Sequence, residues 1–211
     1  MRKVAITPDV AHGLGYALNE ATLLGIEPYE DEREVRLGFS VLALPETESG
    51  PRSATVTLVL SPVGRIAVSY RLGKWNDEGA PVQPLPLTEL ADLVHGFRQQ
   101  PIYGWEFVDS PEERWAHWKD RLSVDVDWER EGRTHVLDVF QEDLSWGKER
   151  ILDVRVWFHD LEVLDAQGYP INVTEFVERG RQWWAALATG DPRTHGHGIY
   201  GLSPDSPGGT G

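Results

Sequence analysis

Two segments in the second half of the sequence alternate polar and apolar residues and carry the side chains best suited to chemistry. The polar members of the alternation are Asp125, Asp127, Asp153, Arg155, Trp157 and His159. Because successive side chains of a β-strand point to opposite faces, these residues are predicted to share one face of a sheet. Paired carboxylates beside an imidazole can exchange protons or hold a divalent cation.

The overall charge of the chain favours a different use of the same face. The sequence has 34 acidic and 20 basic residues, a formal net charge of −14. Such a surface repels nucleic-acid phosphates and anionic lipids and attracts a basic partner. Three consecutive acids, Glu30, Asp31 and Glu32, extend this character into a predicted turn.

We therefore predict a non-enzymatic protein-binding module with an acidic, tryptophan-bearing sheet surface. Its most concrete form is an immunity-type or inhibitor-type protein that neutralises a basic partner, since charge complementarity speeds association and helps reject wrong partners. The predicted partner-binding residues are Asp125, Asp127, Asp153, Arg155, Trp157, His159, Glu30, Asp31 and Glu32.

Three other interpretations remain open. The first is a small-molecule or metal-dependent enzyme that uses the same aspartates and His159, which predicts a concave pocket around them. The second is a homodimeric structural protein that associates through an edge strand or the tryptophan-rich region. In the third, the alternating aspartates only keep a half-exposed sheet soluble.

Three further patterns are interpreted structurally. The His-Gly-His motif at residues 195–197 has two metal-binding imidazoles but lies in a glycine-rich tail that offers no rigidity. The His-Gly-Leu-Gly-Tyr motif at residues 12–16 lacks the strand–loop–helix setting of a phosphate-binding loop. Five aromatic residues are predicted to be mainly core: Tyr103, Trp105, Phe107, Trp115 and Trp118. No catalytic residue, metal site or cofactor is predicted.

Composition excludes several classes of protein. The chain has no cysteine, so disulfides, thiolate metal sites and cysteine nucleophiles are excluded. No apolar run reaches the length of a membrane span, and residues 1–9 do not resemble a signal peptide. No basic stripe suited to nucleic acid is present. We therefore expect a cytoplasmic protein, and the excess of arginine over lysine is typical of a GC-rich bacterial genome.

Hydrophobic periodicity predicts about nine strands. They cover residues 21–27, 34–44, 54–60, 65–72, 103–108, 123–128, 134–141, 151–159 and 161–164. Ser61-Pro62-Val63-Gly64 has proline and glycine where a type I turn favours them, which predicts a hairpin there. Three helices are predicted after Thr88, Ser110 and Thr174, the second of them with a capping box.

The order of these elements predicts an α+β fold made of antiparallel β-hairpins, with eight to nine strands and three helices. Residues 21–99 and 123–187 follow a similar order and are predicted to be duplicated ββββα units. Together they would form a single domain over residues 17–189. Residues 1–16 are predicted to be irregular and residues 190–211 to be a flexible tail. Whether the two halves share one sheet is left open.

Overall fold

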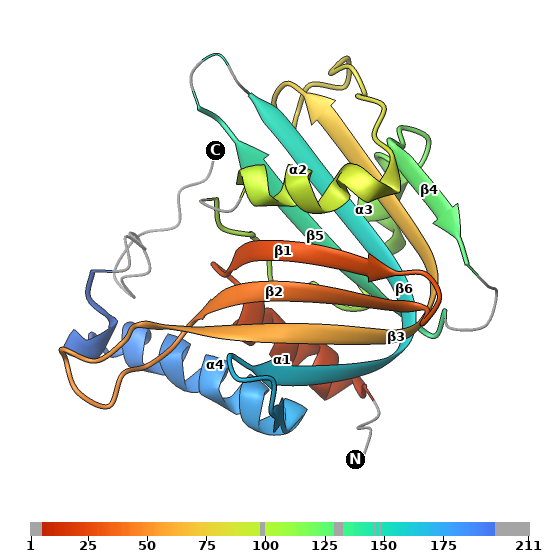
Figure 1. Ribbon diagram of the computed structural model, residues 1–211. Helices are drawn as coiled ribbons and strands as arrows, with labels where there is room; N and C mark the ends of the chain where they lie inside the picture. The colour runs from red at the N-terminus through yellow and green to blue at the C-terminus, as the bar shows by residue number, and fades with distance from the viewer. Residues whose placement is uncertain (1–5, 98–99, 129–132, 146, 148, 197–211) are drawn as a thin grey trace.

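The computed structural model describes residues 6–97, 100–128, 133–145, 147 and 149–196. Over these residues the chain has an α+β fold built on one antiparallel sheet of seven strands, with four α-helices (Figure 1). The predicted α+β class with antiparallel strands is therefore confirmed, with seven strands and four helices in place of the predicted eight to nine strands and three helices. The strands are β1 Thr22–Tyr29, β2 Glu34–Leu42, β3 Ser53–Leu72, β4 Val124–Asp127, β5 His135–Asp143, β6 Arg150–Asp165 and β7 Pro170–Ile171.

Two long strands, β3 and β6, form the centre of the sheet. They pair with each other from Val56 to Leu72 of β3. The other edge of β3 pairs with β2 over Ser53–Leu60 and with β4 over Arg65–Val68. The free edge of β6 pairs with β5 along its first half and with β7 near its end. Each long strand thus contributes to both halves of the sheet.

The predicted hairpin turn at residues 61–64 is wrong. Strand β3 runs through this segment, and its pairing with β6 shifts register between Val63 and Arg65. The turn prediction considered only local residue preferences, whereas β6 pairs with Ser61 and Val63 along one edge and the Val63 amide donates to the Arg33 carbonyl. An extra residue in a ladder bends a strand and increases its twist, so the sheet curves here.

The same irregularity changes which residues of β3 and β6 face the core. In β6 the buried core positions are even-numbered from Leu152 to Phe158, as predicted, and become odd-numbered at Leu161 and Val163. In β3 the buried positions step from Leu60 to Val63 and then to Ile66. The change keeps one continuous apolar face around the bend.

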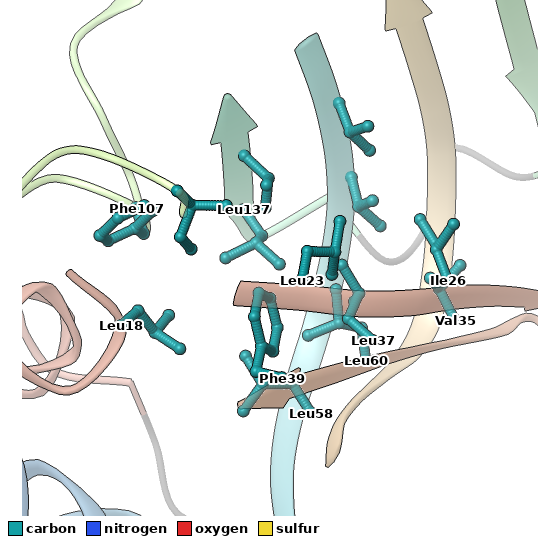
Figure 2. Packing of buried hydrophobic residues seen from close by; sticks show 14 of the residues in the cluster. Leu18, Leu23, Ile26, Val35, Leu37, Phe39, Leu58, Leu60, Phe107 and Leu137 are labelled. Carbon is teal, nitrogen blue, oxygen red and sulfur yellow. The ribbon is translucent and has the colours of Figure 1, made fainter. Parts of the chain in front are cut away.

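One large hydrophobic cluster fills the inner side of the curved sheet. It takes Leu23 from β1, Phe39 from β2 and Leu137 from β5, all nearly inaccessible to solvent. Figure 2 shows these side chains in one cluster, with Phe107, from the segment after α2, beside Leu137. Helix α2 (Leu90–Phe97), which follows the 3-10 turn η1 (Leu87–Glu89), buries its apolar stripe in the same cluster.

Helices α1 (Pro8–Leu18) and α4 (Val173–Ala188) pack against each other beside the first half of the sheet (Figure 1). The predicted irregular structure over residues 1–16 is wrong from Pro8 onward. The Thr7 hydroxyl accepts a hydrogen bond from the Val10 amide, and Pro8 occupies the first turn, so the helix start is well formed. Glycines that suggested a loop instead allow close packing, because a Cβ at Gly15 would lie 2.1 Å from the Trp105 carbonyl oxygen.

The structure does not show the predicted duplication. Strand β4 pairs with β3, so it does not form a hairpin with β5. Both halves of the sequence contribute to one continuous sheet through the β3–β6 pair.

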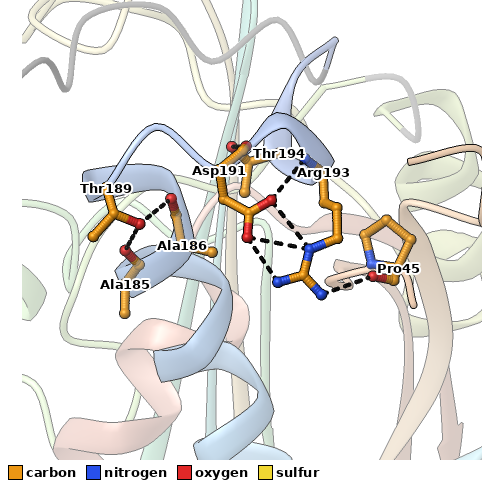
Figure 3. Close-up of polar contacts among 7 residues, drawn as sticks. All are labelled: Pro45, Ala185, Ala186, Thr189, Asp191, Arg193 and Thr194. Atoms are coloured by element: carbon orange, nitrogen blue, oxygen red, sulfur yellow. Dashed lines mark hydrogen bonds and ion pairs between the residues drawn. The ribbon is translucent and has the colours of Figure 1, made fainter. Parts of the chain in front are cut away.

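The chain stays ordered beyond α4, within the segment predicted to be a flexible tail. Residues Pro192–Thr194 form the 3-10 turn η2, and the Asp191 carboxylate accepts hydrogen bonds from the Arg193 backbone and guanidinium (Figure 3). These bonds lower the pKa of Asp191 to about 2. Arg193 also donates to the Pro45 carbonyl at 3.4 Å, which joins the segment to the β2–β3 loop. Residues 197–211, with His197 of the His-Gly-His motif, lie outside the described residues.

The close approach of α1 and α4 depends on Gly180. A Cβ at this position would lie 2.6 Å from the Ala17 Cα, an overlap with backbone that no side-chain rotation relieves. We expect Gly180→Ala to lower the free energy of unfolding by about 1–3 kcal/mol, the usual range for overpacking. Urea denaturation would measure the change.

Gly96→Ala is the matched control. Gly96 also lies inside a helix, but the nearest described atom to its added Cβ would be the end of the flexible Arg150 side chain at 3.4 Å. It should be neutral or stabilise the protein by up to about 1 kcal/mol through helix propensity. Equal effects of the two substitutions would contradict the packing argument.

Candidate functional site

A pocket of about 710 Å³ opens on the outer face of the second half of the sheet. Its floor includes Arg71 of β3, Asp153 of β6, and Asp138 and Phe140 of β5. One wall comes from α3 (Glu112–Ala116) and the turn that follows it, and the other comes from the loop between β3 and η1. Sequence-distant segments thus meet around a polar floor.

Strand register brings the floor residues together. Asp153 lies opposite Ser69 of β3 and Phe140 of β5, and the next outward position, Arg155, lies opposite Asp138. Opposite side chains on one face of a sheet are close enough to interact directly. The alternation of β6 therefore places a carboxylate and a guanidinium in adjacent rows of the same face.

The central contact of the floor is an ion pair between Arg71 and Asp153. The Arg71 guanidinium donates through Nη2 to the Asp153 carboxylate, and the two side chains are 7% and 13% exposed. Within the described part of the chain, Arg71 Nε has no hydrogen-bond partner, and neither has the neighbouring Ser69 hydroxyl. A buried donor without a partner favours a bound acceptor, and of these two residues Arg71 lines the pocket.

Burial raises the pKa of Asp153 to about 6, although the positive charge of Arg71 and its hydrogen bond oppose this shift. Removing a carboxylate from water disfavours its charged form, and here that cost exceeds the attraction of the guanidinium. A carboxyl with such a pKa changes protonation close to neutral pH. Asp153 can therefore give or take a proton from a group bound in the pocket.

Asp138 is the second buried carboxylate of the floor. Burial also raises its pKa, partly offset by a hydrogen bond from the Ser110 hydroxyl and by the charge of Arg155, whose Nε lies 3.3 Å from Asp138 Oδ1. Ser110 was predicted to cap the following helix. Among the described residues no side chain caps α3, because the Ser110 hydroxyl donates to Asp138 instead.

A second, smaller apolar cluster covers the outer face beside the pocket. Trp115 and Trp118 pack edge-to-face with ring centroids 4.5 Å apart, and Trp115 packs on Trp157 at 5.3 Å. The Arg155 guanidinium lies 5.2 Å from the Trp115 ring and 5.3 Å from the Trp157 ring. These cation–π contacts help to hold a guanidinium that is only 2% exposed.

The loop from Gly73 to Val82 forms the other wall and is anchored at several points. The Trp75 amide donates to the Glu142 carboxylate at 2.9 Å, and Arg121 donates to the Ala80 carbonyl. Gly73 has a φ of 144°, a backbone conformation that side chains disfavour. The anchors leave the Trp75 side chain 65% exposed at the rim of the pocket.

The structure brings only part of the predicted partner-binding set together. Asp153 lines the pocket, and Arg155 lies on the same face but is buried beneath α3, so neither belongs to an open surface. Trp157 is half-buried against Trp115. His159 is exposed, and its Nδ1 lies 2.6 Å from the Thr134 hydroxyl.

The remaining predicted residues gather at the bend of the sheet. Asp125 is bound by two hydrogen bonds from Arg65, and Asp127 is ion-paired with Arg133. Glu30–Glu32 are exposed on the β1–β2 turn. This turn reaches the bend, because the Val63 amide donates to the Arg33 carbonyl at 2.7 Å.

Sequence reasoning missed Arg71, Asp138 and the loop that carries Trp75. Arg71 and Ser69 alternate with core residues in the predicted strand 65–72, just as Asp153 and Arg155 do in theirs, so this signal was present. Asp138 likewise alternates with buried Leu137 and Val139. The alternation could not show that β3 and β5 both pair with β6, and this pairing is what places these positions side by side.

Comparison of the chain with models of protein families, with curated protein sequences and with solved structures finds no match. In the part of the chain that the structure describes, no helix is long and apolar enough to cross a membrane. The same residues contain no cluster of three or more His, Asp or Glu side chains arranged to hold a metal ion. The geometry of the pocket therefore carries the functional argument.

The raised pKa of Asp153 predicts how stability depends on pH. The folded state holds this proton more tightly than the unfolded chain, whose aspartate has a pKa near 3.8, so the wild-type protein loses this contribution as pH rises from about 4 to about 6. The Asp153→Asn variant has no carboxyl group at this position, so it cannot lose this pH-dependent contribution to stability. The variant's unfolding free energy, relative to wild type, should rise by about 1–3 kcal/mol between pH 4 and pH 7.

Asp143→Asn is a control of opposite sign. Burial raises the pKa of Asp143, but hydrogen bonds from Ser145 and Arg150 outweigh this and lower it overall. The relative unfolding free energy of this variant should therefore fall as pH rises. Chemical denaturation at several pH values would measure the unfolding free energies of both variants. If these changed with pH in the same direction relative to wild type, the opposite pKa shifts of Asp153 and Asp143 would be contradicted.

Proposed function

We propose that this protein binds a small polar organic molecule in the pocket above Arg71, Asp138 and Asp153. The observation that carries the proposal is the buried Arg71–Asp153 pair at the floor, with Arg71 Nε lacking a partner among the described residues. Burying an ion pair is costly and contributes little to stability by itself. Its position beneath an open cavity supports a role in recognition.

The shape of the site supports the same proposal. A volume of about 710 Å³ lies within the range of small-molecule pockets. Such pockets combine apolar walls with a few polar groups that fix orientation. Here Trp75, Trp118 and Phe140 provide aromatic surface, and the floor provides the polar groups.

Fragment screening by protein-observed NMR tests the proposal. Fragments that bind should shift the indole signals of Trp75 and Trp118 together. Trp75→Ala should weaken the hits about tenfold, because it removes apolar surface worth roughly 1–2 kcal/mol from the rim.

Tyr169→Ala is the control for that variant, since Tyr169 is 69% exposed and does not line the pocket. It should leave affinity unchanged. A screen that yields no hits, or hits whose shifts fall outside the pocket, would overturn the proposal.

A second proposal retains the predicted interaction with a basic protein but places it at the bend of the sheet. Its support is the convergence of the exposed acids Glu30–Glu32 with Asp125 and Asp127 there. Arg65 and Arg133 partly neutralise the two aspartates, so the turn carries most of the unpaired negative charge in this proposal. The contact would be steered by charge and weakened by salt.

Neutralising the acidic turn tests this second proposal. The triple variant Glu30→Gln, Asp31→Asn, Glu32→Gln should lose a partner that the wild type captures from the native lysate at low salt. Glu46→Gln with Glu48→Gln, on the exposed β2–β3 loop, should retain it. Recovery of no partner by the wild type at low or moderate salt would count against the proposal.

A further inference from the structure

The formal charges around the pocket cancel. Three arginines and four carboxylates line it: Arg71, Arg114, Arg121, Glu78, Asp138, Glu142 and Asp153. Arg155, which lies opposite Asp138 on the neighbouring strand and is ion-paired with it, adds a fourth positive charge. A ligand with a net charge would therefore meet no excess of opposite charge, and moving it out of water would be poorly compensated.

The charged groups of the floor are already engaged with one another but retain hydrogen-bonding capacity. Arg71 pairs with Asp153, and Arg155 pairs with Asp138. Arg71 Nε still lacks an acceptor among the described residues, and each carboxylate can accept several hydrogen bonds. Donors and acceptors thus alternate over a small area. A hydroxyl group, which both donates and accepts, suits such a floor.

Aromatic side chains of the rim and the floor add flat apolar surface next to these polar groups. The Trp75 side chain is 65% exposed at the rim, and Phe140 is half-buried beside Asp153. A ligand that covers them gains hydrophobic contact. These features together favour a ligand that is neutral, rich in hydroxyl groups and able to present a flat C–H face.

Resting on the small-molecule pocket proposed above, we infer that the ligand is a neutral carbohydrate. Its ring lies against the aromatic wall, and its hydroxyl groups bind Arg71 and the carboxylates of the floor. A purely apolar aromatic ligand fits less well, because it would leave Arg71 Nε, which is already buried without an acceptor among the described residues, still unpaired. A charged sugar fits less well because of the charge balance of the pocket.

The test is ligand-observed NMR and calorimetry with a defined panel. The neutral probes are glucose, galactose, mannose, N-acetylglucosamine, lactose, maltose and cellobiose. Glucuronate and glucosamine are the charged counterparts. At least one neutral probe should bind, and more tightly than either charged monosaccharide.

Arg71→Lys isolates the recognition contact. Lysine keeps a positive charge beside Asp153 but lacks the Nε–H donor, so affinity for the bound sugar should fall about five- to tenfold. Arg65→Lys is the matched control. Arg65 lies on the same strand and the same face and is also ion-paired, but it does not line the pocket. The Arg65→Lys variant should bind the sugar as tightly as the wild type does. Thermal denaturation would check that both variants are folded.

The outcomes separate this inference from the proposed function. Fragments that bind in the pocket while no neutral sugar binds would overturn the carbohydrate assignment and leave the small-molecule pocket standing. Tighter binding of a charged sugar, or equal losses in the two arginine variants, would also overturn it. Absence of both fragment and sugar binding would overturn the inference and the proposed function together.

Discussion

The pairing of β3 with β6 is the contact on which the rest of the structure depends. The two strands run side by side through a shared bend, and every other strand except β1 attaches to one of their free edges. The register shift near Val63 curves the sheet and keeps apolar residues facing inward on both sides of the bend. As a result, one core serves both halves, and the outer face of the second half is left to be covered separately.

That outer face shows how buried charge is accommodated in this fold. Arg155 and Asp138 are almost inaccessible, and Trp115 and Trp157 surround the guanidinium while Ser110 binds the carboxylate. Each group is supported by neighbours from a different segment, which offsets part of the cost of burial. Asp153 is less completely compensated, which is why its pKa rises toward neutrality. Of the two buried carboxylates, Asp153 is thus the one whose charged form its surroundings stabilise less.

Sequence reasoning succeeded where a property is local and failed where it depends on distant partners. The alternation of Leu152 to Phe158 correctly predicted which side chains of β6 enter the core. The Ser61–Gly64 turn and the Ser110 cap were wrong, because a neighbouring strand and the Asp138 carboxylate compete successfully for the same groups. Glycines at positions 13 and 15 suggested a loop, although they serve close packing of α1 against α4 and Trp105.

By itself, the sequence determined the α+β class, the absence of cysteine chemistry and the division of β6 into an apolar and a polar face, since these follow from composition and a period of two residues. Only the tertiary structure decided that the polar face lies beneath α3 and the Trp75 loop. Arg71 and Asp153 are 82 positions apart in the chain, and their contact exists because β3 and β6 pair. Alternation defines the direction of a side chain, but burial depends on which distant segment covers it.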